Sequence, residues 1–168
     1  MIRVPADRVD SPAFPRNASF ENQIAEMENL ENIPMKFHHV GIVVESIERS
    51  APRYQQFFGL RPVSGVVTDT TQRVNVQFLA SEAGATSVEL IEPLLGESPS
   101  RRALEKGGGL NHLCFEVADI TESVRQAESE GVICVCRPVA AAAFDGRRIA
   151  FLFYRGIGLI EFVEAAAR

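Results

Sequence analysis

The sequence has few of the features that mark membrane, secreted and nucleic-acid-binding proteins. No apolar run approaches the roughly 18 residues of a membrane span, and residues 1–8 lack the apolar core of a signal peptide. The net charge is -5 and basic runs are absent, so the chain offers no footprint for the phosphates of a nucleic acid or an anionic membrane. These absences predict a cytoplasmic protein with neither kind of partner.

Cysteine is also scarce. The three cysteines are an odd number and have no CxxC spacing, which argues against a disulfide framework or a thiolate zinc site; they are Cys114, Cys134 and Cys136. We predict that they are reduced core residues. The remaining composition is ordinary, with 46% hydrophobic and 23% charged residues among 168, which is enough for one globular domain.

Residues 1–36 are predicted to form an N-terminal arm. In residues 1–18, prolines among small and polar residues indicate an arm or a disordered leader; they are Pro5, Pro12 and Pro15. Over residues 19–32, apolar side chains recur at steps of four and three with glutamates between them, which predicts an amphipathic helix that ends before Pro34. Its apolar stripe fits either packing against a sheet or a dimer contact, and both interpretations stay open.

The rest of the chain repeats one pattern twice. Residues 37–44 form a strand-like stretch that contains His39, and residues 111–117 form a similar stretch that contains His112. Glu89 follows the first histidine by 50 positions, and Glu161 follows the second by 49. Such an internal repeat predicts two equivalent modules, each with a histidine near its start and a glutamate near its end.

Each module is predicted to contain a strand, a helix and three further strands. The predicted strands lie near residues 37–44, 61–67, 73–80 and 86–92 in module 1 (about 37–93), and near 111–117, 132–136, 148–154 and 158–164 in module 2 (about 110–164). The helices are predicted at 46–58 and 120–129, with caps at Ser46, at Asp119 or Thr121, and at Gly59 and Gly131. Pro52 predicts a kink in the first helix or a start delayed to Ser50.

The repeated histidines and glutamates are candidate ligands for one divalent metal ion. If the two modules pack as a pseudo-symmetric pair, equivalent strands bring all four side chains to a shared cleft. Imidazole and carboxylate ligands suit Zn, Co, Ni, Mn or Fe, and four of them leave room for water or substrate. Taken singly, each residue is better explained as a core histidine or a solvent-facing glutamate than as a ligand, but the recurrence of all four in register favours the metal site.

The motifs around these residues resemble the vicinal oxygen chelate superfamily of glyoxalases and bleomycin-resistance proteins, and within it the methylmalonyl-CoA epimerases. The resemblance rests on His39-Val-Gly-Ile-Val-Val, Val88-Glu89-Leu-Ile-Glu-Pro93, Gly109-Leu-Asn-His112-Leu-Cys-Phe-Glu-Val117 and Gly158-Leu-Ile-Glu161-Phe. It implies an α+β domain over residues 37–164, in which two βαβββ modules form a cup-shaped mixed sheet. It also places the metal ligands at His39, Glu89, His112 and Glu161.

The same resemblance implies an isomerase that uses the metal to stabilise an enolate, as in racemisation at C2 of an acyl-CoA such as methylmalonyl-CoA. Glu161 is the predicted base, and Glu89 is predicted to serve the opposite face of the substrate. The expected partners are a small-molecule substrate, including an acyl-CoA, and a second copy of the chain in a homodimer.

Two alternatives to the epimerase stay open. One is a glyoxalase I-like lyase or isomerase of another small oxygenated substrate, and the other is a metal-free binding module of the same fold. Ring-cleaving dioxygenase chemistry is disfavoured, because those relatives use a third histidine, whereas His38 is predicted to alternate to the opposite face of its strand.

The substrate-binding residues are predicted from the strand near 73–80 and from the loop 138–148. Gln77 stands on that strand, where some epimerases have a further carboxylate base, and is predicted to orient the substrate. The loop fits either a lid or a plain hairpin turn at Asp145-Gly146. As a lid it would bring Phe144, Arg147 and Arg148 to the substrate, and the arginines would pair with its anionic group.

Overall fold

The computed structural model describes residues 35–82, 87–96 and 98–166 of the chain. The predicted N-terminal arm up to residue 34, including its helix at 19–32, lies outside these residues. The described residues contain a single mixed sheet of nine strands, and the expected α+β architecture of two βαβββ modules is confirmed. No helix of this part of the chain is long and apolar enough to cross a membrane.

The first module contains one helix, and both of its caps agree with the sequence. Its elements are β1 (Met35–Val43), α2 (Ile47–Phe58), β2 (Arg61–Pro62), β3 (Val67–Asp69), β4 (Val74–Ala80) and β5 (Ser87–Pro93). Ser46 is the N-cap of α2, and Gly59 ends the helix in the left-handed conformation that glycine tolerates best. The helix is not delayed to Ser50, since the amide of this residue donates to the Ser46 carbonyl at 3.0 Å.

The strand expected at residues 61–67 is interrupted. Only β2 and β3 pair with β4 on either side of the break. At the break, the hydroxyl of Ser64 accepts the Phe78 amide hydrogen at 2.9 Å. A side chain therefore replaces the carbonyl that a continuous strand would offer, which is the physical reason for the interruption.

The second module repeats this order after a short connection. Its elements, with the preceding helix, are α3 (Arg101–Glu105), β6 (Gly109–Val117), α4 (Ile120–Ser129), β7 (Ile133–Ala140), the 3₁₀ helix η1 (Ala142–Phe144), β8 (Arg148–Tyr154) and β9 (Gly158–Glu164). Asp119 is the N-cap of α4 and accepts the amide hydrogens of Thr121 and Glu122. β7 is longer than the strand expected at 132–136.

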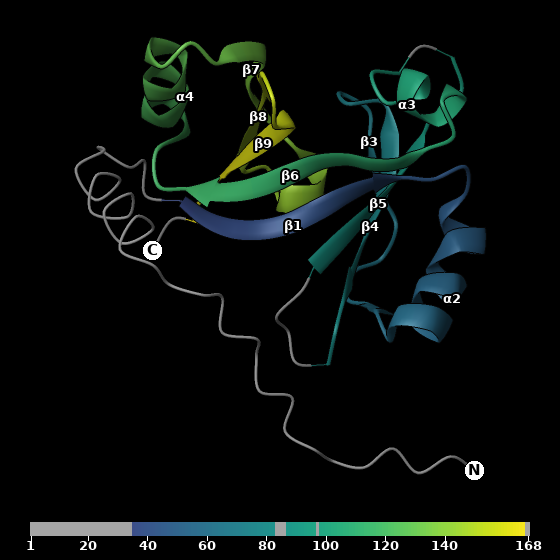
Figure 1. Cartoon of the computed structure of the whole chain (residues 1–168). Coiled ribbons are helices and arrows are strands. Elements are labelled where there is room, and N and C mark those ends of the chain that lie inside the picture. Colours follow the sequence, from purple (N-terminus) through teal and green to yellow (C-terminus); the bar gives the residue numbers. More distant parts are fainter. Residues whose placement is uncertain (1–34, 83–86, 97, 167–168) are drawn as a thin grey trace, which may run out of the picture. The chain divides into compact units, whose positions relative to one another are not determined.

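The strand order shows the pseudo-symmetry of the two modules. The order is β2-β4-β5-β1-β6-β9-β8-β7, so the sequence of strands from the centre outward is equivalent on both sides. β1 runs parallel to β5, and β6 runs parallel to β9. The modules meet where β1 and β6 pair antiparallel, and Figure 1 shows these two long strands side by side between α2 and α4.

Two β-bulges lie at the β1–β6 junction. The register passes from Phe37 opposite Phe115 to His39 opposite Cys114, which leaves His38 without a partner. It then passes from Gly41 opposite His112 to Ile42 opposite Leu110, which leaves Asn111 without a partner. Each strand thus has one extra residue directly before a candidate histidine ligand. A bulge interrupts the strict alternation of side chains between the two faces of a strand.

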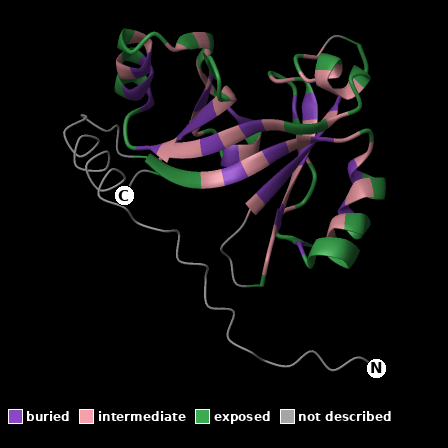
Figure 2. Ribbon diagram, in the orientation of Figure 1, coloured by how far each residue is buried: buried purple, intermediate pink, exposed green. Residues whose placement is uncertain are grey.

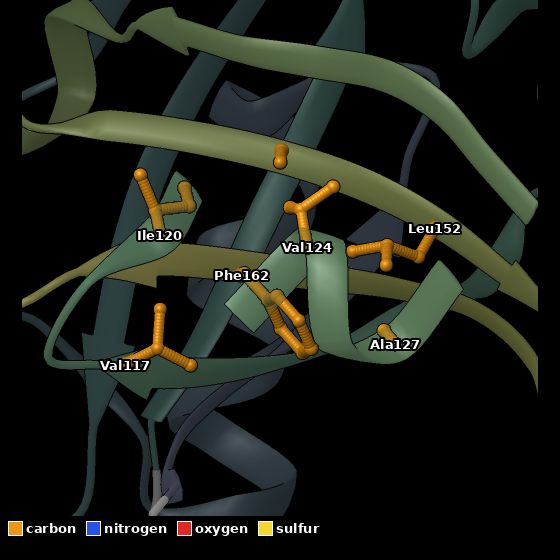
Figure 3. Packing of buried hydrophobic residues seen from close by; sticks show 7 residues of the cluster. Val117, Ile120, Val124, Ala127, Leu152 and Phe162 are labelled. Carbon is orange, nitrogen blue, oxygen red and sulfur yellow. The ribbon is translucent and has the colours of Figure 1, made fainter. Parts of the chain in front are cut away.

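The helices and the candidate site occupy opposite faces of the sheet. In module 2, α4 packs on β8 and β9 through the buried residues in Figure 3, which include Val124, Leu152 and Phe162. In module 1, α2 packs in the same way on Leu79, Val88 and Leu90. Figure 2 shows exposed residues on the outer surfaces of both helices, and most of the buried residues on the strands. Burial of these apolar side chains fixes which face of each strand is left for the site.

Candidate metal centre

Four side chains from the innermost strands of the two modules converge on one point. His39 comes from β1 and Glu89 from the parallel neighbour β5, while His112 and Glu161 come from the equivalent pair β6 and β9. One ligand atom from each of the four lies within 4.8 Å of the others, and all four residues are buried. The structure thus brings together the four residues that the repeat singled out.

The distances between these atoms suit a small cation. The Nε2 atoms of His39 and His112 are 3.1 Å apart. The Oε2 atom of Glu161 lies 3.4 Å from the first Nε2 and 3.3 Å from the second, and Oε2 of Glu89 lies at 3.4 and 3.6 Å. Ligand bonds of about 2.0–2.2 Å place the donors of a tetrahedral ion about 3.3–3.6 Å apart. The observed spacing is close to that range.

The electrostatics of the cluster also favour a cation among the four side chains. The Oε2 atom of Glu161 is buried and is the side-chain oxygen that lacks a hydrogen-bond partner among the described residues. Native proteins rarely leave such an atom unsatisfied, and a bound ion is one established reason when they do. Two imidazole nitrogens and two carboxylates are also a donor set that borderline divalent ions accept. The residues present therefore fit a divalent metal ion.

Burial and neighbouring charges move the pKa values of His39, Glu89 and Glu161 away from their ordinary values. Burial lowers the pKa of His39 to about 4, so its imidazole is neutral. Burial, together with the charge of Glu161, raises the pKa of Glu89 to about 8. For Glu161, burial acts in the upward direction, but the neighbouring imidazoles of His112 and His39 outweigh it and lower the pKa. Without a metal, the two carboxyl groups thus differ in protonation at neutral pH.

Cys114 supports Glu161 from the neighbouring strand. Its thiol lies directly opposite His39 in the β1–β6 pairing and hydrogen-bonds the Glu161 carboxylate. Burial and the nearby carboxylate raise the pKa of this thiol, so the group stays protonated and acts as a donor. Cys114 is a reduced, buried residue, as the cysteine pattern predicts.

A cavity of about 460 Å³ opens beside three of the four side chains, Glu89, His112 and Glu161. Most of its wall is apolar and comes from both modules, with Val74, Val76, Ile91, Phe144, Phe151 and Leu159 among the lining residues. A few polar side chains, including Asp69 and Asn111, complete the wall. An apolar cavity with a few converging polar groups is the usual form of a small-molecule site.

The residues predicted to bind substrate occupy different surroundings. Phe144 lines the cavity and stacks on His39, with ring centroids 6.0 Å apart. Gln77 does not line the cavity, whereas its neighbour Val76 does. The side-chain amide of Gln77 instead donates to the Ser64 carbonyl at 3.2 Å. The two-residue period of β4 accounts for this placement, because Gln77 alternates to the other face of the strand.

The two arginines of the loop 138–148 are held by carboxylates of the same module. Arg147 pairs with Glu116 at 3.2 Å, donates to the Glu164 carbonyl and lies over the Phe144 ring. Arg148 makes a two-pronged ion pair with the carboxylate of Glu164. Neither arginine is among the residues that line the cavity. Their guanidinium groups already have anionic partners within the module.

Asp69 is a buried residue of the cavity wall that the sequence pattern did not single out. One carboxylate oxygen accepts the Gln72 amide hydrogen at 2.8 Å, and the other accepts that of Ala142 at 3.0 Å. The first bond closes a local turn and could have been expected from the Asp-Thr-Thr-Gln sequence. The second bond joins β3 of module 1 to η1 of module 2. No sequence motif near either residue predicts this contact.

The prediction that His38 faces away from the site is wrong. Its Nδ1 atom lies 2.9 Å from Nδ1 of His39, and both rings contact Phe78 and Phe144. The bulge in β1 is the reason, because an extra residue cancels the alternation of one side chain. His38 nonetheless lies behind His39 and is not part of the four-residue cluster.

Comparisons with known proteins agree with this fold and site. Residues 38–151 match the family model of the Glyoxalase/Bleomycin resistance protein/Dioxygenase superfamily, and the chain belongs to this superfamily. Its sequence is 31% identical over 134 residues to the human mitochondrial methylmalonyl-CoA epimerase, an alignment that covers 77% of this chain and 74% of the human one. It is 34% identical over 132 residues to the uncharacterized protein YqjC of Bacillus subtilis, covering 77% and 91% of the two chains.

The fold of this chain is also similar to that of a solved structure. The crystal structure of methylmalonyl-CoA epimerase from Mycobacterium tuberculosis matches this structure with a TM-score of 0.64 at 27% sequence identity, and the match covers 78% of this chain and 88% of the other. The resemblance to the superfamily is therefore confirmed. The expectation of an isomerase is confirmed at the level of enzyme class, because the relatives with a named activity are epimerases.

Proposed function

We propose that this chain is a divalent-metal-dependent epimerase that removes and returns the proton at C2 of a 2-substituted acyl-CoA, with methylmalonyl-CoA as the leading substrate. The ion is one of Co, Zn, Mn, Ni or Fe. The observation that carries the proposal is the pair of buried carboxylates, Glu89 and Glu161, which reach one centre from equivalent strands of two opposed modules.

The arrangement of the two carboxylates suits inversion of one carbon atom. Epimerisation needs a proton acceptor on one face of the carbon and a proton donor on the other, and the two roles exchange when the reaction runs backward. Glu161 belongs to β9 and Glu89 to β5, so they flank the centre from the two modules. We assign Glu161 as the base for one face and Glu89 as its counterpart for the other.

The four-residue cluster would hold the metal through Nε2 of His39 and His112 and through the two carboxylates. When bound, a divalent ion supplies Lewis-acid stabilisation of the negative charge that develops beside the carbon losing its proton. The residues of the chain contribute the rest. The apolar wall that includes Val76, Phe144 and Phe151 excludes water from the acyl group, and burial strengthens every charge interaction in the site.

The size of the cavity supports a small acyl group as the reacting part of the substrate. A volume of about 460 Å³ is within the range of small-molecule sites. The sequence likeness to the human mitochondrial methylmalonyl-CoA epimerase favours an acyl-CoA over other small oxygenated compounds. The anionic end of such a substrate is not assigned to Arg147 or Arg148, because these side chains pair with Glu116 and Glu164.

The proposal is tested by proton exchange in heavy water. The protein loaded with a divalent ion is incubated with each stereoisomer of methylmalonyl-CoA, and deuterium at C2 and the change of configuration are followed separately. We expect both in the original protein. Glu161→Gln and Glu89→Gln are each expected to slow epimerisation at least 100-fold, a typical loss for a removed general base or acid. Each variant can retain exchange on the face that its remaining carboxylate serves.

Glu92→Gln is the matched control, because Glu92 lies on the same strand as Glu89 and instead accepts the amide hydrogen of Ile47 at 2.7 Å. It should leave epimerisation unchanged. Metal-loaded protein that exchanges no C2 proton would overturn the assignment. If the same preparation isomerised the hemithioacetal of methylglyoxal and glutathione, the glyoxalase-like alternative would replace it.

A further inference from the structure

Each histidine of the centre has a hydrogen-bond partner in the residue directly before it. Nδ1 of His39 lies 2.9 Å from Nδ1 of His38, and Nδ1 of His112 lies 3.0 Å from the side-chain oxygen of Asn111. Both partners are the extra residues of the two β-bulges in the β1–β6 pairing. In a regular strand these side chains would point to the opposite face. The bulges therefore supply an equivalent contact to both histidines.

The contact of Asn111 determines which nitrogen of His112 carries hydrogen. A side-chain amide oxygen only accepts hydrogen bonds, so Nδ1 of His112 must donate. In a neutral imidazole the other nitrogen, Nε2, then carries a lone pair. This is the atom that faces Glu89 and Glu161. The bond at Nδ1 thus leaves His112 in the form that binds a metal through Nε2.

We propose that His38 and Asn111 are positioning residues, which accept the Nδ1 hydrogens of His39 and His112 and thereby present both Nε2 lone pairs to the metal centre. His38 performs this role with its Nδ1 atom as acceptor, as Asn111 performs it with an amide oxygen. In metalloproteins, a partner of this kind orients the histidine ring and raises its basicity as a ligand. The inference rests on the proposed metal centre.

The contacts inside the cluster support the same assignment. With hydrogen on both Nδ1 atoms, the two Nε2 atoms at 3.1 Å present lone pairs to each other and cannot form a hydrogen bond. The unpartnered Oε2 of Glu161 lies beside both of them. Three electron-rich atoms in one buried space repel each other unless a cation lies between them. The tautomers that the bulges impose therefore match a site built for a metal ion.

The position of the His38 ring is itself fixed by packing. Its edge meets Phe144 at 5.6 Å and Phe78 at 6.4 Å between ring centroids. Phe78 comes from β4 of module 1, whereas Phe144 comes from η1 of module 2. The acceptor atom of His38 is therefore held by both modules and does not depend on β1 alone.

The pseudo-symmetry provides matched variants for a test. His38→Leu and Asn111→Leu remove the acceptor, and each is expected to weaken metal binding about 10–100-fold, the usual loss for a supporting partner of a ligand. His38→Asn and Asn111→His exchange the two natural acceptors between the equivalent positions, and both should keep the affinity of the original protein. Leu110→Ala, next to Asn111 and with a side chain 69% exposed, is a control for disturbance of β6.

Affinity is measured by competition titration with Zn²⁺ or Co²⁺ against a chromophoric chelator, and thermal unfolding reports on the fold of each variant. Affinity in a leucine variant equal to that of the original protein would overturn the inference. An asparagine at position 38 that weakens binding as much as leucine would also overturn it, because the acceptor would then not be what matters.

The positions of the hydrogens on the two histidine rings can also be measured without the metal. Nitrogen-15 NMR of the histidine side chains in metal-free protein distinguishes hydrogen on Nδ1 from hydrogen on Nε2. We expect hydrogen on Nδ1 in both His39 and His112, and a change at the affected ring in each leucine variant. Hydrogen on Nε2 in the original protein would overturn the inference even if a metal binds. Expected tautomers in a protein that takes up no ion would overturn the metal-dependent function, and with it the role of His38 and Asn111 in metal binding, but would confirm their hydrogen bonds to the two Nδ1 atoms.

Discussion

Gly41 lies directly opposite His112 in the β1–β6 pairing, and a Cβ atom on Gly41 would stand 2.2 Å from Cε1 of the His112 ring. Atoms that are not bonded do not approach so closely, so the imidazole occupies the space that a side chain at position 41 would fill. The equivalent position opposite His39 is taken by Cys114, a small residue. Each histidine thus lies across from a residue small enough to leave room for its ring.

Gly41→Ala is expected to push the His112 ring out of the centre and to weaken metal binding at least tenfold, or about 1.4 kcal/mol. Titration with Zn²⁺ or Co²⁺ measures the effect. Gly65→Ala is the control, since a Cβ atom there meets nothing within 4 Å. Unchanged affinity in Gly41→Ala would show that the position of the His112 ring does not determine metal binding.

The stability of the metal-free protein should fall as the pH rises from about 6.5 to 8. Burial and the charge of Glu161 raise the pKa of Glu89 to about 8 in the folded chain, whereas an unfolded chain has the ordinary value of 4.5. Between these values the folded state holds a proton on Glu89 that the unfolded state has lost, so each rise in pH favours unfolding. Below about pH 6.5 the lowered pKa of His39 acts in the opposite direction, and the net fall is therefore expected above it. Urea denaturation with a chelator present at several pH values measures this slope.

Glu89→Gln should flatten that slope, because glutamine does not titrate. In the original protein, metal binding near pH 7 should also release the proton from Glu89, since a carboxylate ligand must be deprotonated. Calorimetric titration in buffers of different ionisation enthalpy counts the released protons. A metal-free protein whose stability rises between pH 6.5 and 8 would contradict the assignment of the raised pKa to Glu89.

Asp69→Ala should loosen the segment that packs on the centre. The substitution removes the acceptor of two backbone amides, those of Gln72 and Ala142. We expect a loss of about 1–3 kcal/mol in the free energy of unfolding, the cost of leaving buried donors unsatisfied. Hydrogen exchange of the amides in η1 should accelerate. Asp145→Asn, at an exposed position with φ of 55°, keeps a residue that tolerates this backbone and serves as the control.

The equivalent cores of the two modules should respond alike to cavity-forming substitutions. Leu79 in module 1 and Leu152 in module 2 are 0% and 1% exposed and pack beneath α2 and α4. Leu79→Ala and Leu152→Ala should each lower the free energy of unfolding by about 2–5 kcal/mol. Leu95→Ala, at a residue 89% exposed, should change it little. A loss confined to one module would indicate that the modules unfold separately.

The repeat was the most informative feature of the sequence. It marked a histidine and a glutamate in each half, and the structure brings these four polar side chains to one point. The prediction succeeded because the period of two in a strand and the equivalence of the modules are both local properties of the chain.

The contacts of the residues around the site could not be predicted from the sequence in the same way. The partners of Arg147 and Arg148 are Glu116 and Glu164, which approach only when β6, β8 and β9 assemble. The anchor of η1 on Asp69 joins residues 73 positions apart. Contacts of this kind depend on loop paths and register, which leave no periodic signal in the sequence.

By itself, the sequence determined the two-module architecture, the two caps of α2, and the identity of the four converging residues, since each follows from local preference or internal repetition. For α4 it left the N-cap open between Asp119 and Thr121 and placed the C-cap at Gly131, one residue beyond the observed Glu130. Only the tertiary structure decided the direction of the His38 and Asn111 side chains. A bulge forms where two strands must both keep their buried faces and bring their histidines to one centre, and this requirement arises only when β1 pairs with β6.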